Sequence, residues 1–409
     1  MVKLAVISDL HLGFKTGSER KEDAYSQAAK AFSKALSEDP DIIILLGDIF
    51  HKKIPSQETL GESISFFSEL NRKFNKFVKI RKLKENKLVE SGRIPSIVTI
   101  YGTHERRNPG KVNPVHILEK ANLIHCLNKD SILIQINGQR IGLHGLSGVH
   151  DTFAKKELLD WNPKPFDKAF NLFLIHQTFN DIIPTNNSEF LEFKDLPEGF
   201  DMYLLGHIHW KIEEKHPITK KPILVPGSTI RTQLREIESK IEKGFYIINI
   251  VQDRIRTKFV PITTRPFFFE KIKIENQKPS EIVTNVTEKI DNILNKKPKD
   301  KALVKFKIEG KLAEGFLPAD LQIKSLTKKY SDKLFLNIDT SNVTSSDLEK
   351  RESFLQKIMQ RKESVESIGL QLLMNSLKSS DPIIEEIFTS LSEDDLERAK
   401  GLINQIKMK

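Results

Sequence analysis

The stretch Asp41–His51, DIIILLGDIFH, sets an unbroken apolar run directly before a small group of polar residues. Such a run is typical of a strand that is buried on both faces, as in a parallel sheet covered by helices. Gly47 then permits a tight turn, and Asp48 and His51 follow it at once. The stretch therefore predicts a buried strand that presents a carboxylate and an imidazole at its carboxyl end.

The residues on both sides of this strand alternate between helical and extended patterns. Arg20–Glu38 and Gln57–Arg72 carry apolar residues at helical spacing. Further apolar runs predict strands at Lys3–Ser8, Ser96–Ile100, Ile132–Ile136, Arg140–His144, Asn171–Ile175 and Met202–Leu205. Buried strands joined by crossover helices predict an α/β fold built in layers.

The pattern changes after Pro261. Strand patterns at residues 265–275 and Ala302–Gly310 flank a helical pattern at Ser280–Asn295, which indicates a small α+β module. From about Thr344 to the end the pattern is helical. We therefore expect domains at residues 1–262, 263–343 and 344–409. The C-terminal helices either pack onto the body of the protein or dock a partner helix, and the pattern alone leaves both readings open.

Composition narrows the classes of function. The chain has 409 residues and a net charge of +10, which favours an anionic partner such as nucleic acid. Its one cysteine, Cys126, allows no intrachain disulfide and fits a reducing compartment. No apolar run suits a signal peptide or a membrane span, so we expect a cytoplasmic, nucleoid-associated protein. There is no G-x-x-x-x-G-K-[ST] loop, so we do not expect the chain itself to hydrolyse ATP.

Five predicted strand ends carry residues of the types that bind metals. Their segments are SDLHLG (8–13), LLGDIFH (45–51), YGTHERR (101–107), LIHQTF (174–179) and LLGHIHW (204–210). In layered α/β folds, ligands bind at the carboxyl ends of strands. Residues two apart in an extended segment point to one side, so Asp9 pairs with His11, and His207 with His209. One such residue alone is more often structural, but five strand ends in order are hard to explain by packing.

The ligand types indicate which metals fit and how many ions bind. Asp and His without thiolates suit manganese, iron or zinc, and suit magnesium less well. Two Asp and four His are too many for one ion with an open position, but they suit two ions about 3.5–4 Å apart with one bridging carboxylate. Such a pair activates water and clamps the attacking and leaving oxygens, which is machinery for hydrolysing phosphate esters.

The ordered motifs D-x-H, G-D, G-x-H-[DE], a single strand-end H and G-H-x-H resemble those of the calcineurin-like metallophosphoesterase superfamily over residues 1–262. Within it, SDLHLGF, GDIFHKKIPS, GHIHW and PGSTIRTQLREIE resemble the double-strand-break repair nucleases, the bacterial SbcD and the Mre-type nucleases. The resemblance implies a β-sandwich core flanked by helices, a small α+β DNA-capping domain, and C-terminal helices that bind a coiled-coil ABC-type ATPase like SbcC. It also implies a homodimer formed through helices like Gln57–Arg72.

The resemblance further implies a role for each site residue. One ion would take Asp9, His11, Asp48 and His209, and the other would take Asp48, His176, His207 and the residue at position 103, here Thr103. Both ions are expected to be Mn²⁺. His51 and His104 would act on the phosphate by stabilising charge and protonating the leaving sugar oxygen. The implied activity is 3′-to-5′ exonuclease action on duplex ends and endonuclease action on single strands.

Position 103 departs from the family pattern. The family usually has Asn there, whose carbonyl oxygen is a good neutral ligand, whereas Thr103 offers a poorer hydroxyl. Glu105 also replaces the more usual Asp. Three alternatives are open: Thr103 ligates weakly, directly or through water; Glu105 compensates; or the chain is a DNA-end-binding scaffold with reduced catalysis. Because the other ligand positions are intact, we expect activity and weaker binding of the second ion.

Basic residues close to the ligands in sequence are candidates for contacts with a DNA backbone. They are Lys15, Lys52, Lys53, Arg106 and Arg107. The basic run within Asn71–Lys87 is a further candidate, although most such runs are solvated faces. The alternative function is a phosphodiesterase or phosphatase of the same superfamily that acts on small molecules or proteins. The basic charge and the additional domains argue against it.

Overall fold

The computed structural model describes the chain except residues 85–86, 109, 186–188, 253, 346–368, 371–372, 375–380, 393–394 and 408–409. The chain divides into two compact units, one of Met1–Phe269 with Pro298–Lys305 and one of Glu270–Lys297 with Phe306–Lys409. Most of the predicted helical pattern between residues 344 and 380 lies outside the described residues. None of the helices within the described ranges is both long and apolar enough to cross a membrane.

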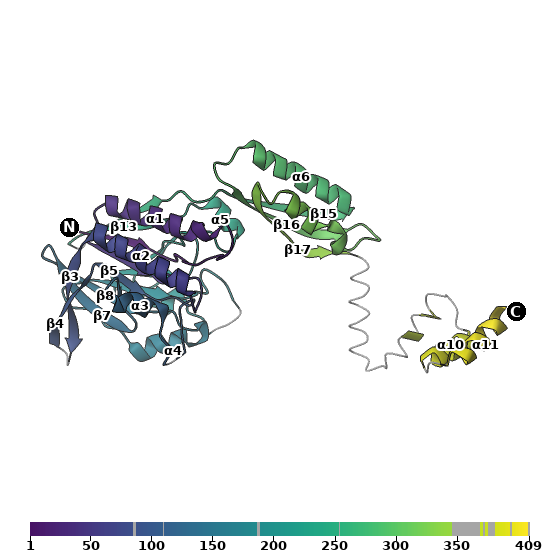
Figure 1. Ribbon diagram of the computed structural model, residues 1–409. Coiled ribbons are helices and arrows are strands. Elements are labelled where there is room, and N and C mark those ends of the chain that lie inside the picture. The colour runs from purple at the N-terminus through teal and green to yellow at the C-terminus, as the bar shows by residue number, and fades with distance from the viewer. Residues whose placement is uncertain are drawn as a thin grey trace. The chain divides into compact units, whose positions relative to one another are not determined.

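Two sheets form the centre of the first unit (Figure 1). Within the described residues, the six-stranded sheet has the order β14 (Arg254–Pro261), β13 (Gly244–Val251), β1 (Val2–Ile7), β2 (Ile42–Leu46), β5 (Ile97–Ile100), β6 (His125–Cys126). The eight-stranded sheet has the order β11 (Ile212–Lys215), β12 (Pro222–Val225), β10 (Met202–Gly206), β9 (Phe170–His176), β8 (Gln139–Leu146), β7 (Asp130–Ile136), β3 (Phe77–Lys84), β4 (Lys87–Pro95). β1, β2 and β5 run parallel, as do β8, β9 and β10, so the carboxyl ends within each set lie at one edge.

Alternation of side chains along the strands creates three apolar layers. On β1, Val2, Leu4 and Val6 pack with inward residues of the second sheet, whereas Ala5 and Ile7 pack against helices. The outer face of the second sheet packs on α4. The order of layers is therefore helix, sheet, sheet, helix, which is the layered α/β fold that the sequence predicts.

Helices and a 3₁₀ turn accompany the two sheets, and most of them cover the two outer faces (Figure 1). They are α1 (Lys21–Ser37), α2 (Gln57–Phe74), α3 (Pro114–Lys120), α4 (Asp151–Trp161) and α5 (Glu236–Lys240), with the 3₁₀ turn η1 (Phe193–Asp195). Two starts are capped by side chains: the Ser56 hydroxyl accepts from Thr59 N at 3.3 Å, and Asn113 Oδ1 accepts from Val115 N at 2.8 Å. The predicted helices at Arg20–Glu38 and Gln57–Arg72 are confirmed to within two residues at each end.

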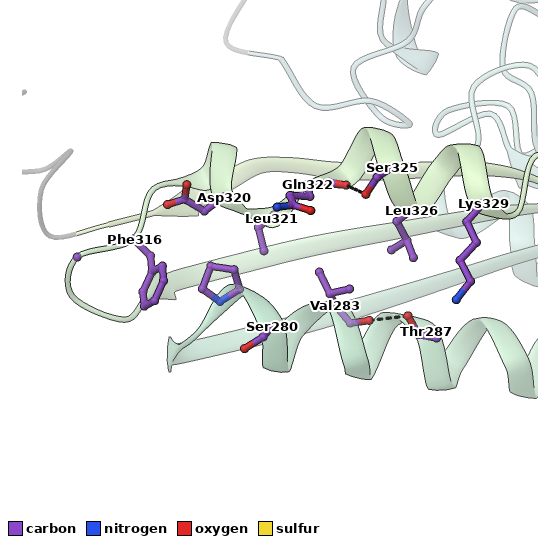
Figure 2. Close-up of a pocket in the computed structure, with 12 residues that line it drawn as sticks. Ser280, Val283, Thr287, Phe316, Asp320, Leu321, Gln322, Ser325, Leu326 and Lys329 are labelled. Atoms are coloured by element: carbon purple, nitrogen blue, oxygen red, sulfur yellow. Dashed lines mark hydrogen bonds between the residues drawn. The ribbon is translucent and has the colours of Figure 1, made fainter.

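A three-stranded sheet in the order β15 (Phe267–Gln277), β16 (Ala302–Leu312), β17 (Leu334–Thr344) lies mostly in the second unit, and only the starts of β15 and β16 belong to the first. Helix α6 (Pro279–Asn295), the 3₁₀ turn η2 (Pro318–Leu321) and helix α7 (Ile323–Lys329) accompany it. A pocket of about 780 Å³ lies between α6 and α7, where Val283 faces Leu321 and Leu326 (Figure 2). Two further helices, α10 (Pro382–Ser392) and α11 (Leu396–Lys407), pair with each other near the end of the chain.

Candidate metal centre

The five predicted strand ends meet where the parallel strands of both sheets finish. Each contributes residues directly after or at the end of its strand: Asp9 and His11 after β1, Asp48 and His51 after β2, Thr103 and His104 after β5, His176 ending β9, and His207 and His209 after β10. Among the described residues, ligand-type atoms gather there in three groups, in each of which they lie within 4.8 Å of one another. Residues far apart in sequence therefore form one site.

The first ligand group is Asp9, His11 and His209, all of them buried. Asp9 Oδ1 lies 3.9 Å from His11 Nε2 and 3.7 Å from His209 Nε2. The two Nε2 atoms lie 3.1 Å apart. One carboxylate oxygen and two imidazole nitrogens therefore converge on one point, which is the donor set of a cation site.

The second ligand group is Asp48, His176 and His207. Asp48 Oδ2 lies 3.3 Å from His176 Nε2. Asp48 and His176 are buried, whereas His207 is half-buried, so this group is the more accessible of the two.

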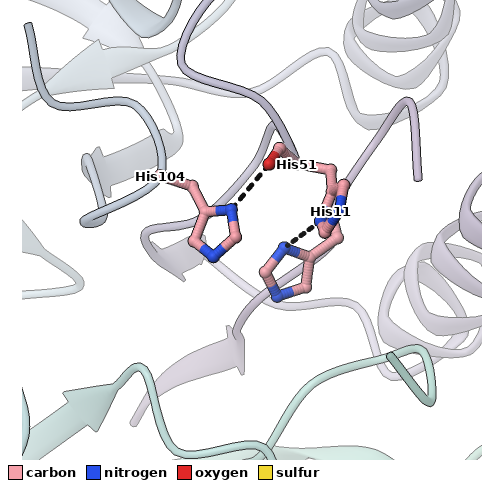
Figure 3. A group of neighbouring side chains, drawn as sticks. All are labelled: His11, His51 and His104. Carbon is pink, nitrogen blue, oxygen red and sulfur yellow. Dashed lines mark hydrogen bonds between the residues drawn. The ribbon is translucent and has the colours of Figure 1, made fainter. Parts of the chain in front are cut away.

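His11, His51 and His104 form the third group, which we call the histidine group (Figure 3). His51 Nδ1 lies 3.4 Å from His11 Nδ1, and His104 Nδ1 lies 2.6 Å from the carbonyl oxygen of His51. His104 Nε2 is 3.9 Å from Asp48 Oδ2. His51 and His104 are half-buried, so they lie between the ligand groups and solvent.

The backbone around the ligands is held in uncommon conformations. Asp9, His11, Asp48 and His207 all have positive φ, from 47° to 79°, which costs a residue other than glycine on the order of 1 kcal/mol. The loops after β1 and β2 maintain these angles by continuing the pairing of their strands. In these loops His11 N donates to the Asp48 carbonyl at 2.9 Å, and Asp9 N donates to that of Gly47 at 3.2 Å.

Each aspartate of the two ligand groups has one carboxylate oxygen that is hydrogen-bonded and one that is free. Asp9 Oδ2 accepts from the Ser8 hydroxyl and from His207 N, and Asp48 Oδ1 accepts from His104 N at 2.9 Å. Asp9 Oδ1, Asp48 Oδ2 and His176 Nε2 are buried and form no hydrogen bond within the described part of the chain. Buried polar atoms are rarely left without a partner. These free atoms point into the two ligand groups, so the donor set fits bound divalent metal ions.

Asp9, Asp48 and His176, which belong to the two ligand groups, shift one another's pKa values. Burial, opposed by His176 and aided by Asp48, raises the pKa of Asp9 to about 7. Burial would also raise the pKa of Asp48, but His176 holds that pKa well below its usual range. Burial would lower the pKa of His176, but Asp48 raises it to about 10. Without metal, an imidazolium therefore compensates a buried carboxylate, and a bound cation would supply the same positive charge.

The remaining ligand histidines are neutral at neutral pH. Burial lowers the pKa of His11 to about 3 and that of His207 to about 4, and it places the pKa of His209 well below its usual range. Burial also lowers the pKa of His51 to about 4. A neutral imidazole has a lone pair to offer a metal, so burial prepares these rings for ligation.

Thr103 and Glu105 have different surroundings. Thr103 Oγ1 lies 3.4 Å from His207 Nδ1, at the edge of the second ligand group. Glu105 is buried with its carboxylate turned onto the backbone, where it accepts from Gly102 N and Phe50 N at 2.6 Å and from Asp48 N at 3.1 Å. These hydrogen bonds hold the loop of Asp48 in place, which argues against Glu105 as a replacement for a missing ligand.

Gly102 shows how closely these loops pack. A Cβ at this position would overlap Asp48 Oδ1, so any side chain there would push the carboxylate out of the second ligand group.

The basic residues predicted to contact DNA differ in their exposure to solvent. The exposed ones are Lys15, Lys52 and Lys53, and the half-buried ones are Arg106 and Arg107. Arg107 donates to the Lys53 carbonyl at 3.3 Å, which joins the loops that follow β2 and β5. The positive charges of Lys52 and Lys15 help to lower the pKa of His51, so both lie near the histidine group. This position suits contact with an anionic substrate.

The basic run within Asn71–Lys87 lies on the end of α2 and on β3, away from any ligand in sequence. Several of its lysines are paired with acids: Lys73 with Glu69, Lys76 with Asp39, Lys79 with Glu90 and Lys82 with Asp130. This pairing favours the solvated-face reading over a phosphate-contact surface.

Two histidines outside the ligand groups, His144 and His216, have hydrogen-bond partners inside the fold. His144 lies 2.8 Å from Ser131 Oγ and 3.0 Å from Asn171 Oδ1, and His216 Nδ1 accepts from Ile218 N and Thr219 N. Sequence reasoning missed several residues that contact a ligand, among them Thr232 and Lys243. The motif PGSTIRTQLREIE contains the first of them, so its polar residues were the available signal.

Comparison with known proteins gives the class to which this fold and site belong. The model of the calcineurin-like phosphoesterase family matches residues 2–211, which include every predicted ligand. The chain belongs to this family, whose members are metallophosphoesterases, and divalent metal ions are therefore implied for the site.

Several curated relatives carry a more particular name. A DNA double-strand break repair protein Mre11 of Saccharolobus solfataricus is 26% identical over 407 residues, covering 96% of this chain and 99% of that protein. A protein of the same name from Sulfolobus acidocaldarius is 24% identical and covers 76% and 75%. A double-strand break repair protein MRE11 of Encephalitozoon cuniculi is 27% identical over 71% of this chain, which spans only 52% of that relative's length.

Proposed function

We propose that this chain is the nuclease subunit of a DNA double-strand-break repair assembly and that it hydrolyses DNA phosphodiesters. The observation that carries the proposal is the convergence of free carboxylate and imidazole atoms from residues 9 to 209 in two adjacent ligand groups. Similarity over almost the full length to an archaeal protein named Mre11 supports DNA as the substrate. The net charge of +10 suits a polyanion.

The ligand groups would hold two Mn²⁺ ions. The first group together with Asp48 would hold one ion, and the second group together with Thr103 would hold the other. When bound, divalent cations supply Lewis acidity, which polarises phosphate oxygens and lowers the pKa of water. The residues of the chain fix the positions of the ligands, because the left-handed loops and the hydrogen-bonded carboxylate oxygens leave little freedom.

His104 is placed to protonate the leaving sugar oxygen. Its Nδ1–H donates to the His51 carbonyl at 2.6 Å, which fixes the ring and turns Nε2 toward the ligand groups. Its side chain is 37% exposed, so a phosphodiester can reach it. In the protonated ring, Nε2–H then donates to the leaving oxygen. His51, beside it, would donate a hydrogen bond to a phosphate oxygen and stabilise the developing charge.

DNA would reach this site over the basic loops that carry Lys15, Lys52, Lys53, Arg106 and Arg107. Contacts of lysine and arginine with phosphates are independent of sequence, as processing of broken ends requires. We propose 3′-to-5′ exonuclease action on duplex ends and endonuclease action on single strands, with residues 263–343 capping the DNA.

The partner would be a coiled-coil ABC-type ATPase bound by the C-terminal helices. On α10 and α11, the side chains of Leu391, Leu396 and Ile403 are 47%, 56% and 40% exposed. Apolar residues at helical spacing on a helix pair can pack against a partner helix. A homodimer would form through α2, where Leu60 and Ile64 are only half-buried. The ATPase partner and the homodimer are both consistent with a protein that works inside the cell in association with DNA.

Degradation of end-labelled duplex DNA tests the proposal. Wild-type protein should release label with Mn²⁺ and should not with EDTA, and Mg²⁺ should support less cutting. His104→Ala should lower the rate by roughly 10²–10⁴-fold, as expected for the loss of a general acid. His150→Ala, which removes an exposed histidine outside the ligand groups, should cut like wild type.

Two results would contradict the proposal. If wild type turned over a small phosphodiester but left DNA intact, the chain would be a phosphodiesterase of another kind. If it bound DNA ends but cut nothing in any metal, it would be a scaffold whose catalysis has lapsed.

A further inference from the structure

The segment Pro226–Glu238, PGSTIRTQLREIE, has no role in the chemistry proposed above, yet it lies against the ligand His209. Ser228 N donates to the His209 carbonyl at 3.3 Å, and Thr229 N donates to the Asp9 carbonyl at 3.3 Å. Two members of the first ligand group are thus in contact with this one segment.

The main chain of His209 is held by a buried ion pair. Lys243 Nζ donates to the His209 carbonyl, to Ser228 Oγ at 2.9 Å and to Glu238 Oε1 at 2.6 Å. The side chains of Lys243 and Glu238 are 2% and 0% exposed. A buried lysine with three partners is rigidly placed, so the remaining freedom of His209 is rotation of its ring.

The hydroxyl of Thr232 restricts the rotation of the His209 ring. Thr232 Oγ1 lies 2.9 Å from His209 Nδ1, on the side of the ring away from the ligand group. When Nδ1–H donates to this hydroxyl, Nε2 keeps its lone pair. That Nε2 is the atom that lies 3.7 Å from Asp9 Oδ1 and 3.1 Å from His11 Nε2. The hydroxyl therefore selects both the tautomer and the orientation that a metal ligand needs.

We propose that Thr232 is a positioning residue of the metal centre, which fixes His209 as a ligand of the ion in the first ligand group. The inference rests on the metal centre proposed above. Outer partners of metal-bound histidines are worth roughly 10–100-fold in metal affinity. Loss of the Thr232 hydroxyl should therefore weaken one ion by that factor and leave the other unchanged.

The test is calorimetric titration of the full-length, chelator-treated protein with MnCl₂. Thr232→Val keeps the shape of the side chain and removes the hydroxyl, and Thr232→Ser restores it. Thr229→Val is the matched control, because Thr229 is buried in the same segment and its Oγ1 has no hydrogen-bond partner in the described part of the chain. We expect selective weakening of one ion in Thr232→Val, recovery in Thr232→Ser, and wild-type binding in Thr229→Val.

Each other outcome has a defined meaning. Wild-type affinity for both ions in Thr232→Val would overturn the inference while the metal centre remains. Equal weakening of both ions, or the same loss in Thr229→Val, would also overturn it, because it would show a general effect on folding. If wild type itself bound no Mn²⁺, the metal centre and the proposed function would fail first.

Discussion

The two ligand groups contain the same residue types but differ in what holds their histidines. In the first group, Thr232 lies 2.9 Å from the outer nitrogen of His209. In the second group, the Leu46 carbonyl lies 2.6 Å from Nδ1 of His176, and Thr103 Oγ1 is 3.4 Å from Nδ1 of His207. A contact of 3.4 Å is weak as a hydrogen bond. Each group therefore has one firmly held ring and one ring, His11 or His207, whose Nδ1 lies 3.4 Å from its neighbour, His51 or Thr103. The firm ring is held by a hydroxyl in the first group and by a backbone carbonyl in the second.

This difference shows that a metal site is specified by more than its ligands. Carbonyls and hydroxyls behind the imidazoles decide which nitrogen is free and where it points. Thr103 lies beside His207 Nδ1 in the second group, so its substitution for the family's usual Asn changes a residue at the edge of that group. The second ion is where we expect the lower affinity.

The largest effect on metal affinity should come from Asp48→Asn. This substitution should weaken both ligand groups and so remove the difference between them. Asp48 compensates His176, and its charge also acts on His11 and His207. Asn keeps the size and the hydrogen bond from His104 N but removes the charge. We expect both Mn²⁺ ions to bind more than about 100-fold more weakly, since this loss exceeds that of an outer partner.

Calorimetric titration with Mn²⁺ measures this effect, and Asp160→Asn, which changes an exposed carboxylate on α4, is the control. Retention of one ion at wild-type affinity in Asp48→Asn would show that the two groups do not share this charge.

A smaller change in metal affinity is expected from substitutions of Thr103, and it tests the part of this residue in the second ligand group. Thr103→Asn supplies a carbonyl oxygen, which is a better neutral ligand than a hydroxyl, and Thr103→Val supplies none. The affinity of the more weakly bound Mn²⁺ should rise on the order of tenfold in Asn and fall in Val. In the same titration, this affinity should be highest in Thr103→Asn, intermediate in wild type and lowest in Thr103→Val. If Val bound this ion as tightly as wild type, Thr103 would have no part in the site.

The smallest effect concerns His144, a buried histidine outside both groups that serves as a reference. Burial lowers its pKa to about 4, from an ordinary value of 6.5. Between these values the unfolded chain gains a proton on His144 and the folded protein does not, so stability falls as the pH drops through this window. His144→Gln removes this loss of stability. The difference in free energy of unfolding by which wild type exceeds His144→Gln should therefore narrow by about 1–2 kcal/mol between pH 7.5 and pH 5.

Urea unfolding of the chelator-treated proteins at the two pH values gives the difference. A difference that stayed constant would mean that folding does not lower the pKa of His144.

The sequence predicts the strands that carry the ligands because each is an unbroken apolar run with a polar residue at its end. Parallel neighbours then bring those ends together, as the structure shows for β1, β2 and β5. The β3–β4 hairpin was not predicted, since its lysines suggested a charged surface. The alternation of Val78 and Ile80 with Lys79 and Arg81 was the signal for a strand.

The supporting shell could not be predicted from local pattern. Glu105 contacts Asp48 N across 57 positions of the chain, and Thr232 contacts His209 across 23. Nothing in spacing or polarity shows that Glu105 turns inward onto the backbone, because a strand-end carboxylate next to a ligand is equally suited to a metal. Such contacts depend on how the two sheets face each other, which only the assembled fold determines.

Strand β1 lies between β2 and β13, so it receives one of its two neighbours only when Gly244–Val251 has emerged from the ribosome. The first ligand group likewise joins Asp9 and His11 to His209. At roughly 5–20 residues per second, a nascent chain waits about 10–40 s between the synthesis of its first ligand and its last. During that interval the growing polypeptide has no complete ligand group, and translation itself delays the moment at which the centre can attack a phosphodiester.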